Sequence, residues 1–554
     1  MQENKFVPAA NARKNSPLSR RKFFTTTSAG IVTGLVATNS IAKNHSSAPA
    51  LELATNPTSR ADQALKIRTD AAILERNRPI PNIVTNGDES GLINRIGCFT
   101  KTLPHDAQGM VNGNAYNLYL KAMNSGLRED YEAIPLGGPG KLVNPQAGLA
   151  FDLEGTDSHQ LSIPAAPAFS SAEEAGEMAE LYWQALSRDL HFEEYNFNPY
   201  MRFIANDLNR FSEFKGPRSN SRVLPATLFR GTLKGDEVGP YISQFLFKDI
   251  PNGAQTIKQQ YRVPNLGNDH MQRFSDWLRI QNGNAPIRPI SYDETPRYIR
   301  NNRDLGEYVH LDYTYQAFLN AALILLGFGR TALDENNPYL TSRTQNPFST
   351  FGAPQVLDVV ARVANSALKA AWYQKWNVHR RLRPEEFGGC VHSTATQVAS
   401  RPIHEELLRS NALQAVYDFT GSYLLPMAYP EGCPAHPAYP SGHATIAGAC
   451  VTVLKAFFNE DFVIPNPVYA SPDGLDLFGY RRGSLTVGGE LNKLASNIAI
   501  GRNAAGVHWR SDALEGLKLG EAVALSCLQN FRPTFNEPFS GSNLTKFDGE
   551  KITI

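Results

Sequence analysis

The sequence predicts an all-α protein: a helical bundle whose helices are joined by long loops. Three observations indicate this class. The run Ala317–Gly329 is apolar on all sides, later segments place apolar residues three and four positions apart, and strand-like alternation is scarce in the C-terminal half. The 554 residues are 42% hydrophobic, which provides for a large core, and the formal net charge of +1 argues against a nucleic-acid partner.

The first 42 residues are predicted to form a twin-arginine export signal. The stretch Ser19–Phe24 (SRRKFF) contains a paired arginine, and a Thr-rich apolar run follows it and ends in small residues at Ala42. A basic tail or a membrane anchor is the alternative, but the run is too polar to make a good membrane span. We therefore expect the protein to be exported to the periplasm or beyond.

The rest of the chain is expected to form one helical domain with a long N-terminal elaboration. Residues 43–90 are polar and are predicted to be an extended segment. In residues 91–310, helices alternate with loops rich in Pro, Asn and Gly, and one helix begins with the capping-box pattern SAEE at Ser171–Glu174. Residues 311–535 are predicted to be the helical bundle, and residues 536–554 a C-terminal tail.

The bundle begins with the apolar run Ala317–Gly329, which is too short to cross a bilayer. It suits the centre of a bundle or a seam between subunits, and no membrane span is expected. Apolar periodicity predicts the bundle's other helices, which are residues 354–382, 441–458, 489–505 and 512–528.

The five cysteines show no CxxC spacing, so a zinc site and a c-type haem attachment are not expected. One pair could be bridged, and the odd number leaves at least one thiol unpaired. The loop Leu333–Asn337 (LDENN) offers oxygen ligands for a structural calcium ion, although its spacing fits a solvated acidic turn better.

The helix predicted at 354–382 places a lysine on its apolar face. Apolar residues recur at steps of four, three, four and four residues from Val356 to Ala371, and the next member of that face is Lys375. Arg383 follows eight residues later, immediately before Pro384, where a helix should end. The lysine could extend to the surface and the arginines could form a solvated helix end, but a buried lysine would need a negative partner.

A second helix repeats this arrangement. Leu491, Ala495 and Ile498 define an apolar face, and the next step lands on Arg502. His508 and Asp512 follow at six and ten residues beyond this arginine. Because two helices each deliver a cation from a buried face, coincidence becomes less probable than a shared anionic partner.

The third segment is His436–His443, where Ser441 and Gly442 stand at the expected start of a helix. Free backbone N–H groups and the positive end of the helix dipole favour an anion there. Together with Lys375, Arg383 and Arg502, which we call the cation cage, this helix start and the histidines predict a site for a tetrahedral oxyanion.

These three blocks resemble the superfamily that joins type 2 acid phosphatases to vanadium-dependent haloperoxidases. Lys375 with Arg383-Pro384, then Pro440 to His443, then Arg502, His508 and Asp512 are similar to its motifs. The eight-residue interval from Lys375 to Arg383, the long N-terminal half and His436 resemble algal and cyanobacterial bromoperoxidases, whereas phosphatases usually have an interval of seven.

The resemblance implies a helical-bundle fold and one vanadate per subunit. By resemblance, His508 would bind vanadium, and Lys375, Arg383, Arg502, Ser441 and Gly442 would hold the vanadate oxygens. His443 would act as general acid–base and Asp512 would orient His508. The substrates would be hydrogen peroxide, a halide and an organic acceptor, without haem or flavin, and homo-oligomers are usual among the relatives.

The resemblance leaves two questions open. His436 favours bromide and iodide as the halides, whereas Trp372, three residues before Lys375, is shared with both brown-algal bromoperoxidases and fungal chloroperoxidases, so chloride stays open. Trp372 could equally be plain core packing. The alternative function is an exported acid phosphatase with His508 as nucleophile.

Overall fold

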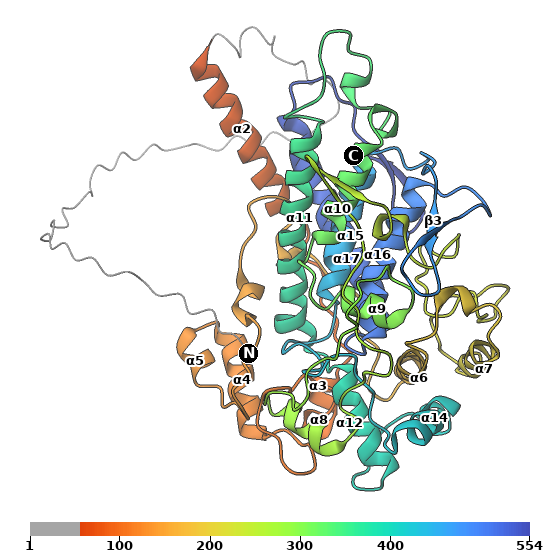
Figure 1. The fold of residues 1–554 in the computed structure, drawn as a ribbon. Helices are drawn as coiled ribbons and strands as arrows, with labels where there is room; N and C mark the ends of the chain where they lie inside the picture. The colour runs from red at the N-terminus through yellow and green to blue at the C-terminus, as the bar shows by residue number, and fades with distance from the viewer. Residues whose placement is uncertain (1–55) are drawn as a thin grey trace, which may run out of the picture. The chain divides into compact units, whose positions relative to one another are not determined.

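The computed structural model describes residues 56–554, and the segment expected to be the export signal, 1–42, lies outside them. Residues Arg60–Ile554 form one compact unit. Helices dominate it, and strands occur only as short two-stranded hairpins in this part of the chain (Figure 1). The all-α prediction is therefore confirmed.

The helices that precede the bundle are α2 (Pro57–Arg76), α3 (Asp88–Gly91), α4 (Gly113–Ser125), α5 (Arg128–Glu132), α6 (Ala172–Leu186), α7 (Pro199–Leu208), α8 (Phe274–Gln281) and α9 (Asn302–Tyr308). The helices that follow are α10 (Gln316–Gly327), α11 (Ala353–Tyr373), α12 (Pro384–Ala395), α13 (Glu405–Leu408), α14 (Asn411–Thr420), α15 (Gly442–Phe457), α16 (Val487–Ala504) and α17 (Arg510–Phe531).

The strands pair antiparallel as three hairpins: β1 (Ile250–Asn252) with β2 (Gln255–Ile257), β3 (Val468–Ala470) with β4 (Leu477–Gly479), and β5 (Asn543–Thr545) with β6 (Lys551–Thr553). The last hairpin occupies the predicted C-terminal tail. It packs against the bundle, because Leu544 is buried beside Ala456 of α15.

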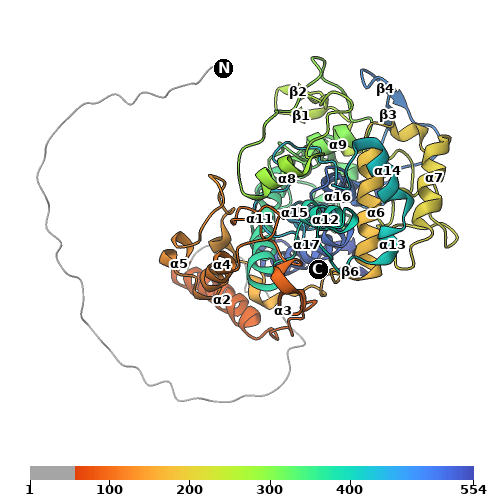
Figure 2. The ribbon, with the colours of Figure 1, turned by 90° about the horizontal axis from the view of Figure 1, so that it is seen from below.

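Helix α15 is the centre of the bundle and packs against α11, α16 and α17 (Figures 1 and 2). Two glycines allow α15 and α17 to approach closely. A Cβ on Gly448 would lie 2.0 Å from the carbonyl oxygen of Leu517, and one on Gly520 would lie 1.9 Å from that of Thr445. This contact fixes the start of α15, which carries Ser441, against the start of α17, which carries Asp512.

Two predicted details differ in the structure. The segment expected to be extended contains α2, a 20-residue helix with no buried residue. At α6, Ser171 caps the helix by accepting from the Glu174 N–H at 3.1 Å, as predicted. The Glu174 side chain, however, does not return to the cap, because it pairs with Arg381 in the interior.

The helix predicted to reach residue 382 changes its geometry near Lys375. It is α-helical to Tyr373, and Gln374–His379 then form a π-helical turn before Arg380 adopts a left-handed conformation with φ 44°. The wider turn alters the direction of the side chains that follow. Such turns occur often at functional sites.

Candidate active site

Lys375 lies in the π-helical turn that follows α11 and is fully buried. Its Nζ donates to the carbonyl oxygens of Pro437 and Ala438, each at 2.7 Å. These carbonyls belong to the loop that leads to Ser441. The predicted lysine on the apolar face is therefore buried beside the start of α15 and does not reach the surface.

Arg383 is the residue before the first turn of α12 and is also fully buried. Its Nη1 donates to His508 Nε2 at 2.9 Å and to the Val507 carbonyl at 2.7 Å. Its Nη2 donates to His436 Nδ1 at 2.9 Å. One guanidinium group thus brings together His436 and His508, which lie far apart in the sequence.

Arg502 projects from the last turn of α16. Its Nη1 donates to the Val309 carbonyl at 2.6 Å, and its guanidinium carbon lies 5.4 Å from the centre of the Tyr429 ring. Its Nε is buried and has no hydrogen-bond partner among the described residues. A buried N–H without an acceptor is costly, which makes this atom a candidate contact for an anion.

Ser441 and Gly442 form the start of α15, as the sequence predicts. Ser441 is the N-cap: its side chain accepts from the Ala444 N–H, and its own N–H donates to the Asp512 carbonyl at 2.9 Å. A Cβ on Gly442 would lie 3.1 Å from the Trp372 ring. Glycine therefore leaves room between this helix start and the aromatic side chain that flanks it.

His508 and Asp512 form a buried hydrogen-bonded pair in which Asp512 Oδ2 lies 2.7 Å from His508 Nδ1. The carboxylate holds the hydrogen on Nδ1, so the lone pair of Nε2 points towards Arg383. Burial, followed by the charges of Arg383, Lys375 and Arg502, places the pKa of His508 well below its ordinary value. The imidazole is therefore neutral and able to bind a metal.

His443 lies in the first turn of α15 and is partly exposed. Its Nε2 lies 3.0 Å from Asp312 Oδ1, in the loop between α9 and α10. The sequence analysis did not identify Asp312, since no spacing pattern relates two residues 131 positions apart. The aspartate can orient a general acid–base at this place.

Burial and the nearby Arg383 also lower the pKa of Lys375 well below its ordinary value. Burial and the same guanidinium lower the pKa of His436. Burial is the larger cause in both cases, and the positive charge of Arg383 adds to it. The side-chain partners of Lys375, Arg383 and Arg502 in residues 56–554 are carbonyl oxygens, imidazole nitrogens and a tyrosine hydroxyl, with no carboxylate among them.

A second buried group lies directly behind the cation cage. Arg381 donates from Nη1 to Asp512 Oδ1 at 2.9 Å and from Nη2 to Glu177 at 3.1 Å, and it also contacts Glu174. We call these three carboxylates the carboxylate layer. Burial raises the pKa of Glu177 to about 7, although Arg381 opposes this shift. This layer fixes Asp512, and through it His508.

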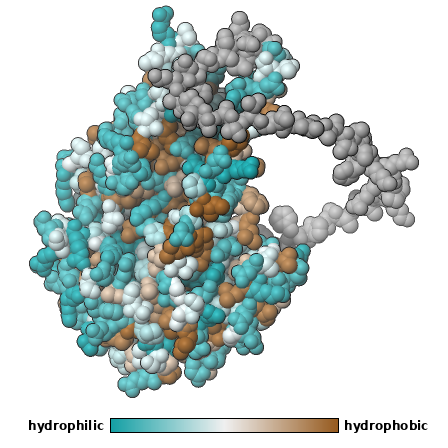
Figure 3. All heavy atoms as spheres, turned by 180° about the vertical axis from the view of Figure 1, so that it is seen from behind, coloured by the Kyte–Doolittle hydropathy of each residue, from teal (hydrophilic) through white to brown (hydrophobic). Residues whose placement is uncertain are grey.

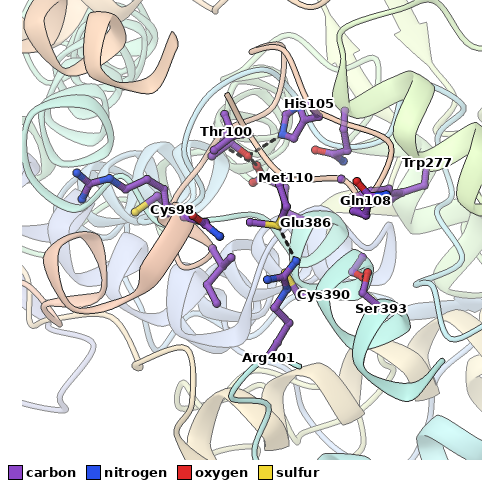
Figure 4. Close-up of a pocket in the computed structure, with 17 residues that line it drawn as sticks. Cys98, Thr100, His105, Gln108, Met110, Trp277, Glu386, Cys390, Ser393 and Arg401 are labelled. Carbon is purple, nitrogen blue, oxygen red and sulfur yellow. Dashed lines mark hydrogen bonds between the residues drawn. The ribbon is translucent and has the colours of Figure 1, made fainter. Parts of the chain in front are cut away.

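Arg383 is fixed from its other side by Glu386, the third residue of α12. Glu386 Oε2 accepts from the Arg383 backbone N–H at 2.8 Å, and Oε1 accepts from the Thr100 hydroxyl at 3.0 Å. Thr100 in turn contacts His105 Nε2 at 3.0 Å (Figure 4). These residues line a cavity of about 30 Å³, large enough for one or two water molecules.

Trp372 lies at the edge of the site. Its ring centre is 4.7 Å from that of His436 and 5.9 Å from Lys375 Nζ, and its Nε1 donates to the Val143 carbonyl at 3.2 Å. The side chain is partly exposed, and it also packs against the hydrophobic cluster that includes Trp376. Together with His436 it flanks Lys375.

The remaining predicted features lie away from this site. Residues 56–554 contain all five cysteines, and none is bridged. In Leu333–Asn337, Asp334 is buried and accepts from the Asn336 N–H at 3.0 Å, so the acidic turn is less solvated than expected. The described part of the chain has no cluster of three or more His, Cys, Asp or Glu side chains arranged for a metal ion.

The chain is similar to known proteins over most of its length. A family model described as the VCPO second helical-bundle domain matches residues 359–537. The chain is 37% identical to the vanadium-dependent bromoperoxidase of Corallina pilulifera, over 90% of this chain and 99% of that protein. It is 36% identical to the vanadium-dependent bromoperoxidase of Ascophyllum nodosum, over 90% and 93%.

A solved structure shows the same fold over almost the whole chain. The homohexameric structure of the second vanadate-dependent bromoperoxidase of Ascophyllum nodosum superposes with a TM-score of 0.86 and 30% sequence identity, covering 94% of each chain. The similarity thus includes the N-terminal elaboration as well as the bundle.

Proposed function

The chain belongs to the family of vanadium-dependent bromoperoxidases and is an enzyme of that kind, and we propose that it oxidises bromide and iodide with hydrogen peroxide. The product is hypohalous acid, which halogenates organic acceptors. The observation that carries this proposal is the cation cage, in which three buried cations have no carboxylate partner among the described residues.

The residues of the site fit vanadate, and we propose one vanadate per subunit. The buried Nε of Arg502 lacks an acceptor, Lys375 and Arg383 add two positive charges, and the start of α15 adds backbone N–H groups. These donors suit a tetrahedral oxyanion. His508 offers a neutral Nε2 as metal ligand, with Asp512 as the hydrogen-bonded partner that such ligands have.

The roles proposed for the residues follow from these positions. Lys375, Arg383 and Arg502 neutralise the oxygens, with Ser441 and the Gly442 N–H at the helix start. Vanadate, when bound, supplies a Lewis acid that activates peroxide for attack by halide. His443 Nε2 donates to Asp312, which fixes the ring, so His443 holds or releases the catalytic proton at Nδ1.

Bromide is the preferred halide in this proposal, with iodide also oxidised. The Nδ1 atom of His436 contacts Arg383 Nη2, and the Trp372 ring packs against the His436 imidazole. This pair forms one wall of the site beside Lys375. Relative rates with bromide, iodide and chloride at equal concentration test the order, and chloride oxidation faster than bromide oxidation would contradict it.

The decisive experiment is a bromination assay on protein stripped of bound oxyanion, with and without added vanadate. Activity should appear only with vanadate, and phosphate should compete during reconstitution because it has the same shape and similar charge. Activity that survives chelation without vanadate would contradict the proposal. So would efficient phosphate ester hydrolysis by the protein as isolated, with vanadate acting only as an inhibitor.

Two variants separate the roles of the histidines. His508→Ala should lose vanadate retention, because it removes the proposed bond from protein to metal. His443→Ala should retain more of the vanadate and lose turnover, because it removes the acid–base group alone. If both variants bind vanadate normally and brominate, the cage is a structural anion site.

We propose that the protein is exported by the twin-arginine route, on the support of the paired arginine in Ser19–Phe24. Among the described residues, no helix combines the length and hydropathy needed to cross a membrane. Changing Arg20 and Arg21 to Lys should retain the protein in the cytoplasm, which fractionation measures. Unchanged export of this variant would exclude the route.

We also propose a homo-oligomer, since the solved relative is a homohexamer. The N-terminal part of the chain leaves large apolar side chains exposed, among them Leu65, Ile80, Phe151 and Leu153, and hydrophobic patches interrupt the hydrophilic surface in Figure 3. Burying such groups favours association. Light scattering on the full chain measures the state, and a monomer at micromolar concentration would contradict the proposal.

A further inference from the structure

The loop between α9 and α10 contacts the candidate site at two places. At one end, the Val309 carbonyl accepts from Arg502 Nη1 at 2.6 Å. At the other, Asp312 Oδ1 lies 3.0 Å from His443 Nε2. A displacement of these few residues would therefore disturb a cation of the cage and the proposed acid–base together. We call residues 309–313 the strap.

His310 lies between these two contacts and is held by carboxylates on both ring nitrogens. Its Nε2 lies 2.6 Å from Glu431 Oε1, and its Nδ1 lies 3.3 Å from Glu307 Oε2. The ring also stacks on Tyr429, with centroids 3.8 Å apart and planes within 10°. The His310 side chain is only 13% exposed, in contrast to its neighbour Leu311, which is 59% exposed.

Glu431 belongs to the loop that leads to His436 and Ser441, and this loop is fixed independently. Lys101 Nζ donates to the carbonyl oxygens of Glu431 and Cys433, at 2.8 and 2.6 Å. The His310–Glu431 contact therefore joins the strap to a fixed part of the site. Tyr429, on the same loop, lies between His310 and the Arg502 guanidinium.

We propose that His310 is a positioning residue: its contacts with Glu307 and Glu431 hold the strap so that Val309 stays on Arg502 and Asp312 stays on His443. The proposal rests on the proposed function, because it assigns His310 a part in preparing that site. His310 itself touches none of the groups that would hold vanadate, and it acts through the residues on either side of it.

The charge on His310 determines how firmly this arrangement is held. Burial alone would lower the pKa of His310, but the hydrogen bonds to Glu307 and Glu431 outweigh burial and raise it above its ordinary value. The contribution is therefore complete below the unfolded-state pKa of about 6.5 and is lost as pH rises through the folded-state value. The ionisable groups around the ring are Glu307, Glu431, Tyr429, Asp312, Arg502, Arg262 and Lys101.

The test measures binding of inorganic phosphate and of vanadate to the full chain stripped of oxyanion, by calorimetry from pH 6 to pH 9. His310→Gln and Glu431→Gln remove one charge each and keep the side-chain size. Each should weaken binding about tenfold at pH 6, as loss of an outer partner does in metal sites. The difference from wild type should narrow as pH rises towards 9, because the wild-type ring loses its proton as pH passes its raised pKa.

The comparison with wild type cancels the ionisation of the anion and of Lys375, which all the proteins share. The double variant should bind no more weakly than either single variant, because both remove the same contact. His159→Gln is the matched control, since His159 forms an exposed pair with Asp157 at 2.7 Å, and it should bind as wild type does. Circular dichroism and thermal unfolding verify that each variant folds.

Two outcomes would overturn the proposal: variants that bind like His159→Gln at every pH, or a loss that is the same at pH 6 and pH 9. A failure of the proposed function looks different, because the wild-type protein itself would then fail to brominate with added vanadate and peroxide, whatever the variants bind. If Glu431→Gln fails to fold, Glu431→Asp provides a second measurement. Binding restored in Glu431→Asp supports the role proposed for the negative charge at this position. Binding as weak as that of His310→Gln contradicts that role.

Discussion

Arg381 and Arg383 are two residues apart and are both buried, yet their surroundings are opposite in charge. Arg381 points into the carboxylate layer, where Glu174, Glu177 and Asp512 contact its guanidinium. Arg383 points into the cation cage, where its side-chain partners are imidazole nitrogens and carbonyl oxygens. The chain thus places an excess of negative charge and an excess of positive charge on two sides of one short segment.

The difference shows how to distinguish a structural arginine from a ligand-binding one. A buried guanidinium that the protein compensates with its own carboxylates contributes to the fold. A buried guanidinium without such compensation is maintained by the rest of the structure and is available to an external anion. Asp512 belongs to both regions, because it contacts Arg381 with one oxygen and His508 with the other.

The largest expected effect comes from removing the compensated arginine. Arg381→Met leaves three carboxylates close together in the interior without a cation. Breaking a buried pair in this way destabilises a protein by about 3–5 kcal/mol. Unfolding in urea, measured without oxyanion, should show this loss, and the matched variant Arg383→Met should show a smaller one, because it removes hydrogen bonds but leaves no buried carboxylate without a cation. Equal losses for the two variants would remove the distinction between the regions.

The second effect concerns the anion. Phosphate at about one hundred times its dissociation constant should stabilise the wild-type protein by about 2.7 kcal/mol, because it binds only the folded state. Arg383→Met should lose most of this stabilisation, since it removes a guanidinium from the cage. Thermal unfolding with and without phosphate measures the difference. Full phosphate stabilisation of the variant would place the anion elsewhere.

The cage was predictable from the sequence because each of its residues has a local cause. Lys375 and Arg502 follow from helical periodicity, and Ser441 from the chemistry of a helix start. The prediction was therefore correct about which faces these residues occupy. It was incomplete about α11, because the π-helical turn at Gln374–His379 depends on how the following loop packs.

The partners of these residues could not be predicted in the same way. Asp312 lies 131 residues from His443, and Glu174 lies 207 residues from Arg381. Local patterns contain no information on such pairs. The capping-box pattern at Ser171 was even misleading for Glu174, since the interior pair with Arg381 outweighs a second hydrogen bond at the cap.

The third effect is the pH dependence of the free energy of unfolding, which should differ in sign between the two regions. The pKa of Glu177 is raised to about 7, mainly by burial, so Glu177 stabilises the fold below its unfolded value and this stability is lost as pH rises through 7. Glu177→Gln should therefore gain about 2 kcal/mol relative to wild type between pH 5 and pH 7. Urea unfolding at both pH values measures this gain.

In the cation cage, the stability contributed by His508 should change with pH in the opposite direction. The pKa of His508 is lowered, by burial first and then by Arg383, so its contribution to stability is present above pH 6.5 and is lost as pH falls below it. A Glu177→Gln protein should consequently show a steeper rise of stability with pH than wild type, since the opposing carboxyl no longer titrates. Parallel pH curves for the two proteins would contradict the raised pKa of Glu177.

The smallest effect comes from a pair on the outer side of the helix that carries Asp512. In α17, Lys518 Nζ lies 2.7 Å from Glu515 Oε1, and the lysine side chain is 62% exposed. Water already compensates the charge of the lysine, and pairs with an exposed partner contribute about 0.2–1 kcal/mol. Lys518→Ala should therefore change the free energy of unfolding by less than about 0.5 kcal/mol, because alanine also favours the helix. Urea unfolding measures this change beside Arg381→Met, and it should shrink further in 0.5 M salt, which screens exposed charges. A loss of several kcal/mol on removing Lys518 would mean that ion pairs in α17 stabilise the fold irrespective of burial, and the contrast between Arg381 and Arg383 would then lose its physical basis.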